Sequence, residues 1–124
     1  MTDSTVSVRY LVDDVQAAID FYTGHLGFTL GLEHVPAFAE VTRGNLRLLL
    51  SGPQSSGARA TPADAAQPGR NRIHLVVDDV ADEWDRLAAA GVTFRSELVE
   101  GPGGRQFLVA DPAGNLVELF TPAG

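Results

Sequence analysis

The chain repeats one pattern of strand and helix signals, and this repeat restricts the folds that are open to it. The pattern of residues 8–15 (VRYLVDDV) is repeated 65 positions later at residues 73–80 (IHLVVDDV), and each copy contains an acidic pair. The triplet Gly44-Asn45-Leu46 is likewise repeated 70 positions later, as Gly114-Asn115-Leu116. The second spacing is wider, which predicts a longer connection in the second copy, near the glycine-rich residues 101–104.

Each copy predicts four strands and one helix. Alternating apolar residues indicate strands, and apolar residues at helical spacing follow each acidic pair, where carboxylates favour a helix N-terminus. The predicted helices span residues 14–25 and 79–90. The predicted strands are residues 6–12, 28–33, 37–42, 46–50, 73–77, 93–99, 105–110 and 116–120. The fold class is therefore α+β, built from two βαβββ units.

The segment between the copies differs in composition. Residues 52–70 are rich in Gly, Pro, Ala, Ser and Gln and contain hardly any large apolar side chain, which predicts a flexible linker. We expect residues 1–51 to form the first unit and residues 71–124 the second, within one domain overall. 

The composition limits the kinds of chemistry and of binding partner that the chain can have. The chain has no cysteine, which excludes disulfides and thiol chemistry. Its net charge of -7 argues against nucleic acid or an anionic membrane and favours a neutral or cationic ligand. The absence of a signal segment and of a long apolar run favours a soluble, cytoplasmic protein.

The last predicted strand carries an unusual carboxylate. Leu116, Glu118 and Phe120 share one face of it, because side chains alternate along a strand. A carboxylate between two large apolar side chains indicates a partly lined cavity. The alternative is an edge-strand glutamate that faces water.

The paired pattern resembles the vicinal-oxygen-chelate superfamily, which holds glyoxalase I, extradiol dioxygenases, fosfomycin-resistance transferases and bleomycin-resistance proteins. The matching segments are residues 14–28, 79–91 and 111–120. The resemblance is nearest in character to the metal-free, bleomycin-resistance-like members. It implies that each unit curls its mixed sheet into half of a cup-shaped cleft, and that ligands lie in the cup.

The resemblance also places the family's metal-ligand positions, on the first and fourth strand of each unit. They fall at Ser7, Leu48, Arg72 and Glu118, of which only Glu118 is an ordinary ligand for a divalent cation. His74 could join it through a shift of register, but catalytic metal sites generally need three protein ligands. We therefore expect no metal and no other cofactor; if a metal binds, His74 and Glu118 are its candidate ligands.

The predicted ligand-binding residues combine polar anchors with apolar walls, the usual composition of a small-molecule site. Glu118 could pair with Arg72 or with His74, and the same cluster could instead be a structural ion pair that closes the sheet. Trp84 is expected in the core because of its helical spacing with Val80 and Leu87. The candidate ligand-binding residues are Ser7, Arg9, Leu48, Leu50, Arg72, His74, Phe107, Glu118 and Phe120.

These features favour a metal-independent protein that binds a small organic molecule, cationic or planar, and sequesters an antibiotic or drug as a homodimer. No catalytic residue is assigned. Two alternatives stay open: a metal-dependent glyoxalase- or dioxygenase-like enzyme that uses Glu118, and a structural or regulatory dimer.

Overall fold

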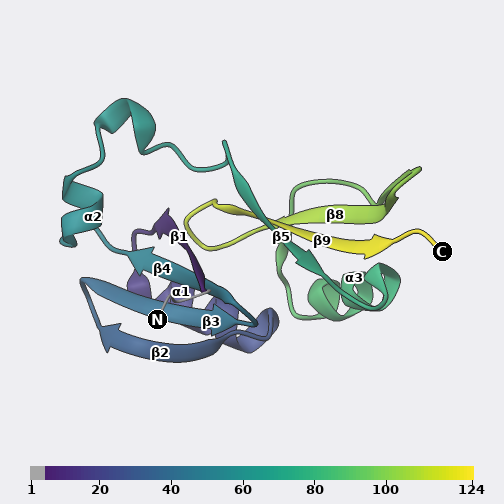
Figure 1. The fold of residues 1–124 in the computed structure, drawn as a ribbon, viewed down its shortest axis with the longest axis horizontal. Helices are drawn as coiled ribbons and strands as arrows, with labels where there is room; N and C mark the ends of the chain where they lie inside the picture. The colour runs from purple at the N-terminus through teal and green to yellow at the C-terminus, as the bar shows by residue number, and fades with distance from the viewer. Residues whose placement is uncertain (1–4) are drawn as a thin grey trace. The chain divides into compact units, whose positions relative to one another are not determined.

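The structure, a computed structural model, describes residues 5–124 of the chain. The chain forms two compact units, Met1–Gln67 (unit 1) and Pro68–Gly124 (unit 2). Each unit is a mixed sheet with one main helix, in the order strand, helix and then further strands (Figure 1). This confirms the predicted α+β class with two βαβββ units.

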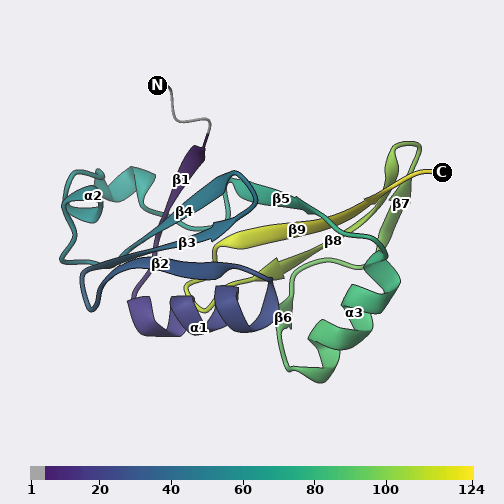
Figure 2. The same ribbon diagram turned by 60° about the horizontal axis from the view of Figure 1, so that its bottom comes forward.

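Unit 1 has a four-stranded sheet. Its elements are β1 (Val6–Leu11), α1 (Val15–His25), β2 (Thr29–His34), β3 (Phe38–Arg43) and β4 (Leu46–Ser51). The strand order is β1-β4-β3-β2, with β1 parallel to β4 and the other pairs antiparallel. Helix α1 covers one face of this sheet (Figure 2). Its apolar stripe supplies the buried side chains Val15, Ala18, Ile19, Phe21 and Tyr22.

Helix α1 begins and ends where its sequence signals predict. The Asp14 side chain accepts a hydrogen bond of 3.1 Å from the backbone N–H of Ala17 and so caps the N-terminus. The helix ends at His25, and Gly27 follows with a φ of 74°, a conformation that glycine adopts without steric cost.

Residues 52–67 contain more regular structure than their composition predicts. They form the short helix α2 (Ser56–Arg59) and the 3₁₀ helix η1 (Ala63–Ala65), both within unit 1. The buried Ser55 starts α2, because its hydroxyl accepts a 3.1 Å hydrogen bond from Ala58 N–H and donates one of 2.7 Å to the Gly52 carbonyl. A local capping signal thus orders the beginning of a segment that has few apolar residues.

Unit 2 repeats the arrangement, with its second strand divided into two short strands, β6 and β7. Its elements are β5 (Arg72–Val76), α3 (Val80–Ala89), β6 (Thr93–Phe94), β7 (Val99–Gly101), β8 (Gly104–Ala110) and β9 (Leu116–Pro122). The strand order is β5-β9-β8-β6, with β5 parallel to β9, and β7 pairs with β8. 

The predicted strand at residues 93–99 was wrong in its extent, because it is interrupted between β6 and β7. At the interruption, the Ser96 hydroxyl accepts a 2.9 Å hydrogen bond from Leu108 N–H. A serine side chain there takes the part that a backbone carbonyl plays in a continuous ladder.

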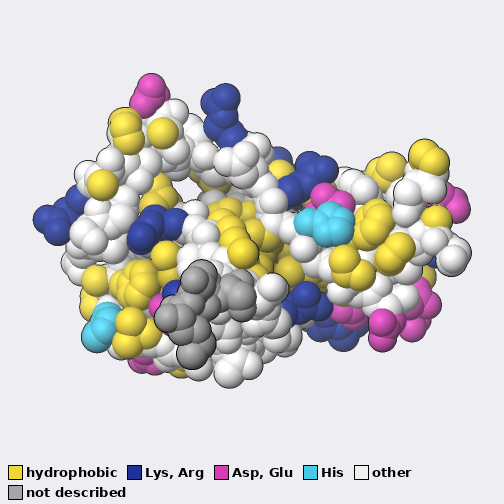
Figure 3. All heavy atoms as spheres, viewed as in Figure 1, with side chains coloured by type: hydrophobic (Ala, Val, Ile, Leu, Met, Phe, Trp, Pro, Cys, Tyr) yellow, Lys and Arg dark blue, Asp and Glu magenta, His cyan; other side chains and the backbone are white. Residues whose placement is uncertain are grey.

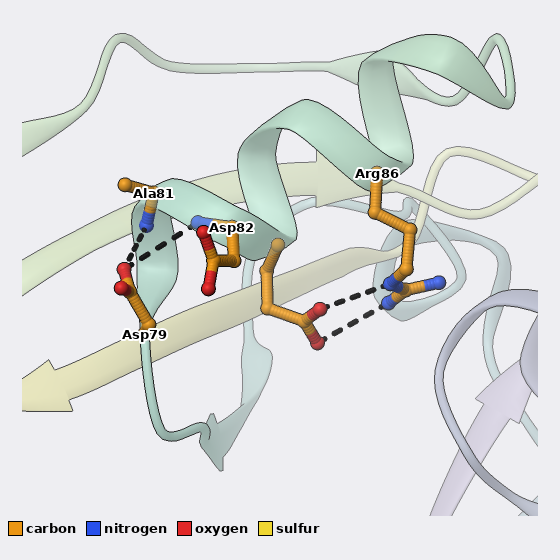
Figure 4. Close-up of polar contacts among 5 residues, drawn as sticks. Asp79, Ala81, Asp82 and Arg86 are labelled. Carbon is orange, nitrogen blue, oxygen red and sulfur yellow. Dashed lines mark hydrogen bonds and ion pairs between the residues drawn. The ribbon is translucent and has the colours of Figure 1, made fainter.

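Helix α3 is capped from two sides. The Asp79 carboxylate accepts hydrogen bonds from the backbone N–H groups of Ala81 and Asp82, at 2.9 Å and 3.4 Å (Figure 4). From β9, the Thr121 hydroxyl accepts a 3.0 Å hydrogen bond from Val80 N–H and donates one of 3.0 Å to the Val77 carbonyl. These contacts fix the start of α3 against the end of β9.

An aromatic cluster forms the core of unit 2 between α3 and the sheet. The Phe107 ring, fully buried, lies 5.2 Å from Trp84 and 5.4 Å from Phe94, measured between ring centroids. Trp84 therefore turns its ring toward the core, as its spacing predicts, and is half-buried there. Within residues 5–124, no helix has the length and apolar character needed to cross a membrane.

Candidate functional site

Each sheet has one face packed against its helix and a second face that we call the open face. Because side chains alternate along a strand, burial and register assign the residues of the central strands to one of the two faces. The open face of unit 1 carries Ser7, Arg9, Phe38, Glu40, Arg47, Leu49 and Ser51. The open face of unit 2 carries Arg72, His74, Val76, Gln106, Leu108, Leu116, Glu118 and Phe120.

Glu118 lies at the centre of the open face of unit 2 and is engaged at both carboxylate oxygens. Arg72 Nε donates a 2.8 Å hydrogen bond to Glu118 Oε1, and His74 Nε2 lies 3.4 Å from Glu118 Oε2. The Glu118 side chain is only 9% exposed, whereas those of Arg72 and His74 are 43% and 47% exposed. The sequence analysis left open whether Glu118 pairs with Arg72 or with His74. In the structure both side chains contact Glu118.

An aromatic surface adjoins this cluster. The rings of His74 and Phe120 lie 4.8 Å apart between centroids, tilted by 42°. Figure 3 shows a histidine, an acidic and a basic side chain together over β5 and β9, beside hydrophobic side chains. Hydrogen-bonding groups and an aromatic surface therefore meet on one sheet face, a combination typical of sites for organic ligands.

The loop before β9 sets the position of Glu118. Asp111, which is buried, accepts hydrogen bonds at Oδ1 from the N–H groups of Ala113 and Asn115, at 3.0 Å and 2.8 Å. Its Oδ2 accepts a 3.0 Å hydrogen bond from the Asn115 side chain, and Gly114 supplies the one positive φ of the loop, 93°. The predicted turn is thus a tightly bonded loop that fixes the start of β9.

The open face of unit 1 is built around Arg9. Arg9 Nη1 donates a 2.8 Å hydrogen bond to the hydroxyl of Ser51, which is fully buried. Gly57 of α2 packs directly on the guanidinium of Arg9, because a Cβ at Gly57 would lie only 2.6 Å from Arg9 Cζ. On the same face, Arg47 Nε lies 3.8 Å from Glu40 Oε1.

Most of the chain matches the sequence pattern of one protein family. The model of the Glyoxalase/Bleomycin resistance protein/Dioxygenase superfamily matches residues 5–119. The chain belongs to this superfamily. No curated protein sequence matches it.

Solved structures share the fold of this superfamily member over nearly its full length. A lactoylglutathione lyase from Agrobacterium tumefaciens is 24% identical with a TM-score of 0.77, and the match covers 97% of this chain and 94% of that one. TnmS3, an antibiotic binding protein from Streptomyces sp. CB03234, is 27% identical with a TM-score of 0.76, covering 96% and 95%. TioX from Micromonospora sp. ML1 is 26% identical with a TM-score of 0.76, covering 97% and 99%.

Three of the apolar residues that the sequence assigned to the ligand site of this superfamily member lie elsewhere. Leu48, Leu50 and Phe107 are each 0% exposed and face the helix side of their sheets. They alternate with Leu49 and Leu108, which lie on the open faces. These three residues are core, because a side chain packed under a helix cannot also line the open face. Ser7, Arg9, Arg72, His74, Glu118 and Phe120 lie on the open faces.

The sequence repeat also paired the wrong residues of β4 and β9. His74 lies beside Glu118, and Arg9, the counterpart of His74, lies beside Leu49. Glu118 therefore corresponds to Leu49, 69 positions earlier, and not to Leu48. The loop at residues 111–115 is one residue longer than the matching residues 43–46, so aligning the two Gly-Asn-Leu triplets shifts the register by one.

Sequence reasoning missed Leu49, Ser51 and Gly57 as parts of the open face of unit 1. Leu49 and Ser51 could have been found from the alternation of side chains along β4, because they share a face with Arg47 and lie beside the strand of Arg9. Gly57 left no signal, because only the folded chain shows that Arg9 needs a neighbour without a side chain.

The donor set of this superfamily member does not suit a catalytic divalent metal. Throughout residues 5–124, no three His, Cys, Asp or Glu side chains come close enough together to hold a metal ion. Glu118 is held by Arg72, whose permanent positive charge repels a cation. Its counterpart in unit 1 is Leu49, which has no ligand atom. 

The Glu118 cluster makes a testable contribution to stability. Replacing Glu118 with glutamine keeps the shape but removes the charge that Arg72 and His74 face, so we expect the free energy of unfolding to fall by about 1.5–3 kcal/mol. Arg72→Gln is expected to cost at least as much, because it leaves a buried carboxylate without its nearest cation. Urea denaturation of each variant measures both effects.

The matched control is Glu83→Gln on α3, whose partner Arg86 donates from Nε at 2.9 Å on an exposed helix face. That change should cost less than about 0.5 kcal/mol, since exposed pairs contribute little. Combining Glu118→Gln with Arg72→Gln should cost less than the sum of the two single changes. Equal effects of the Glu118 and Glu83 changes would show that Glu118 is exposed to water in solution.

Proposed function

We propose that the protein binds a small organic molecule without a metal and sequesters it, and that the molecule is an antibiotic or a similar drug. One observation carries this proposal: the buried Glu118 has both carboxylate oxygens engaged by Arg72 and His74, next to the ring of Phe120. A carboxylate placed in this way orients cationic and aromatic groups around it, and the adjacent Arg72 cation repels a metal ion.

The chemistry of the open face of unit 2 supports an organic ligand. Glu118 occupies Nε of Arg72, so the guanidinium keeps its two terminal nitrogens for an acceptor group of a ligand. The tilted pair of His74 and Phe120 offers a surface for a planar ring, which aromatic side chains bind by offset or edge contact. We infer that the ligand is planar and carries hydrogen-bond acceptors. 

The similarity to TnmS3 supports the same class of function. TnmS3 is an antibiotic binding protein, and the match covers nearly all of both chains at 27% identity. The lactoylglutathione lyase is 24% identical and its likeness concerns the fold alone. Glu118 as a general base stays the alternative, because a carboxylate that accepts one hydrogen bond at Oε1 keeps further lone pairs for a substrate proton.

We extend the proposal to a cytoplasmic homodimer of the bleomycin-resistance kind. A pair of open sheet faces per chain gives such a dimer several surfaces on which a ligand can be enclosed. Sedimentation equilibrium measures the oligomeric state directly, and a monomer at working concentrations would remove this part of the proposal.

The function is tested by a thermal-shift screen of planar antibiotics, followed by calorimetric titration of each hit. We expect at least one compound to raise the melting temperature, and we expect Phe120→Ala and Glu118→Gln to weaken its binding about tenfold or more. Leu30→Ala, a change of an exposed residue on β2, is the control and should leave binding unaltered.

Elemental analysis of the purified protein separates this function from the enzyme alternative. The proposal expects no stoichiometric zinc, iron, nickel or manganese, and no change in ligand affinity after treatment with a chelator. Stoichiometric metal that depends on Glu118 would overturn the metal-free proposal and favour a metal-dependent enzyme.

A further inference from the structure

Arg9 differs from the other arginines of the open faces because its partner is neutral. Arg72 pairs with Glu118 at 2.8 Å and Arg47 with Glu40 at 3.8 Å, so both cations have a carboxylate beside them. Arg9 donates instead to the Ser51 hydroxyl, and no carboxylate of residues 5–124 forms an ion pair with it. The positive charge of Arg9 is therefore uncompensated in the part of the chain that the structure describes.

Two contacts hold the Arg9 guanidinium in one orientation. The hydroxyl of Ser51 accepts from Nη1, and Gly57 of α2 lies against the guanidinium so closely that any side chain there would overlap it. Ser55 fastens the start of α2 through its bonds to Gly52 and Ala58. An arginine held in this way loses less side-chain entropy when its remaining N–H groups, at Nε and Nη2, bind a ligand.

The nearest carboxylate on the same sheet face does not neutralise Arg9. Leu49 lies next to Arg9 in register, and Glu40 lies on the far side of Leu49. Two strand spacings, about 10 Å between backbones, separate Arg9 from Glu40. Glu40 also pairs with Arg47.

Apolar side chains lie beside this cation. Leu49 is its neighbour in register, and Phe38 lies in register with Ser51, the residue to which Arg9 donates. A fixed guanidinium next to aliphatic and aromatic surface suits a molecule that has an anionic group on an apolar or aromatic frame. Because the chain carries a net charge of -7, such an anion must be held by short-range contacts and not by long-range attraction.

We propose that the open face of unit 1 is a binding site for an organic anion, with Arg9 contacting its carboxylate, sulfonate or phenolate group. The inference rests on the proposed function in taking the open faces as ligand surfaces. The acidic net charge of the sequence favours a cationic ligand. The inference proposes an anionic ligand instead.

The test compares two fluorescent probes that share one aromatic frame. 8-Anilinonaphthalene-1-sulfonate carries a sulfonate, and N-phenyl-1-naphthylamine is its neutral counterpart. The folded protein should bind the sulfonate at least about tenfold more tightly than the neutral probe, the size expected for one charge-assisted hydrogen-bonded contact. Melting curves recorded in parallel verify that each variant is folded.

Three variants assign the preference to Arg9. Arg9→Gln should abolish the preference for the sulfonate while the affinity for the neutral probe changes less than about twofold. Gly57→Ala, which forces the guanidinium to move but keeps its charge, should reduce the same preference. Arg59→Gln removes one exposed positive charge from α2 and is the matched control, which should behave as the unaltered protein.

The outcomes separate the inference from the function on which it rests. Binding of both probes with no preference, or a preference that survives in both Arg9→Gln and Gly57→Ala, would overturn the inference alone. An equal loss in Arg59→Gln would overturn it too, because the preference would then reflect overall charge. Failure of both probes, together with an empty antibiotic screen, would overturn the proposed function as well.

Discussion

Replacing Phe107 with alanine is expected to lower the free energy of unfolding by about 3–5 kcal/mol, the usual cost of removing a buried phenylalanine ring. Phe107 is fully buried and contacts the rings of Trp84 and Phe94 between α3 and the sheet. The loss leaves a cavity that the neighbouring rings can fill only in part. Chemical denaturation followed by tryptophan fluorescence measures it directly, since Trp84 is the one tryptophan of the chain.

Phe120→Ala is the matched comparison, because the same ring is removed from the open face of the same sheet. Phe120 is half-buried, so its loss should cost only about 1 kcal/mol while weakening the binding of a planar ligand. Similar costs for the two changes would contradict the assignment of Phe107 to the core and Phe120 to the open face.

Gly104→Ala is expected to cost about 3 kcal/mol, through backbone strain and overlap together. Gly104 has a φ of 150°, and a Cβ there would overlap the Thr121 carbonyl and lie 2.9 Å from Phe120 Cζ. The clash involves backbone, so β9 itself must move. We therefore also expect weaker ligand binding at Phe120, measured by the same calorimetric titration.

The control for Gly104 lies in the same hairpin. Gly101 has no atom within 4 Å of the position of an added Cβ, and its φ is not in the left-handed region. Gly101→Ala should therefore change stability by less than about 0.5 kcal/mol. If the two alanine variants melt alike, the close approach of β8 to β9 at Gly104 does not exist in solution.

Most of the fold was predictable because its signals are local. Asp14 and Asp79 lie at the starts of both main helices, and alternation along the strands marked nearly every sheet element. The errors occurred where a single side chain changes the backbone pattern. Ser96 interrupts a strand by bonding Leu108, and Ser55 starts a helix in a segment whose composition predicts a linker.

The candidate site was predictable mainly on the first strand of each unit and around Glu118, where Ser7, Arg9, Arg72 and His74 lie on the open faces. The apolar neighbours of Glu118 along its own strand indicated that it faces a cavity. The alternation of side chains along β5 predicted that Arg72 and His74 lie on the same face as each other. In unit 1, the position of Leu48 depended on an alignment across two loops of unequal length. An alignment error of one residue exchanges the two faces of a strand. For this reason the sequence prediction assigned Leu48 and Leu50 to the ligand site, although both are core residues.

The unequal loops have a consequence for protein engineering. The two units place equivalent backbone positions at Leu49 and Glu118, beside Arg9 and His74 respectively. A designer who wishes to give both units a carboxylate on the open face must introduce it at residue 49, where it would lie beside Arg9. The same carboxylate at residue 48 would be enclosed among Val41, Leu50 and the side chains of α1, with no cation to receive it. The unequal loops thus decide which residue of β4 lies beside Arg9 and which lies under α1.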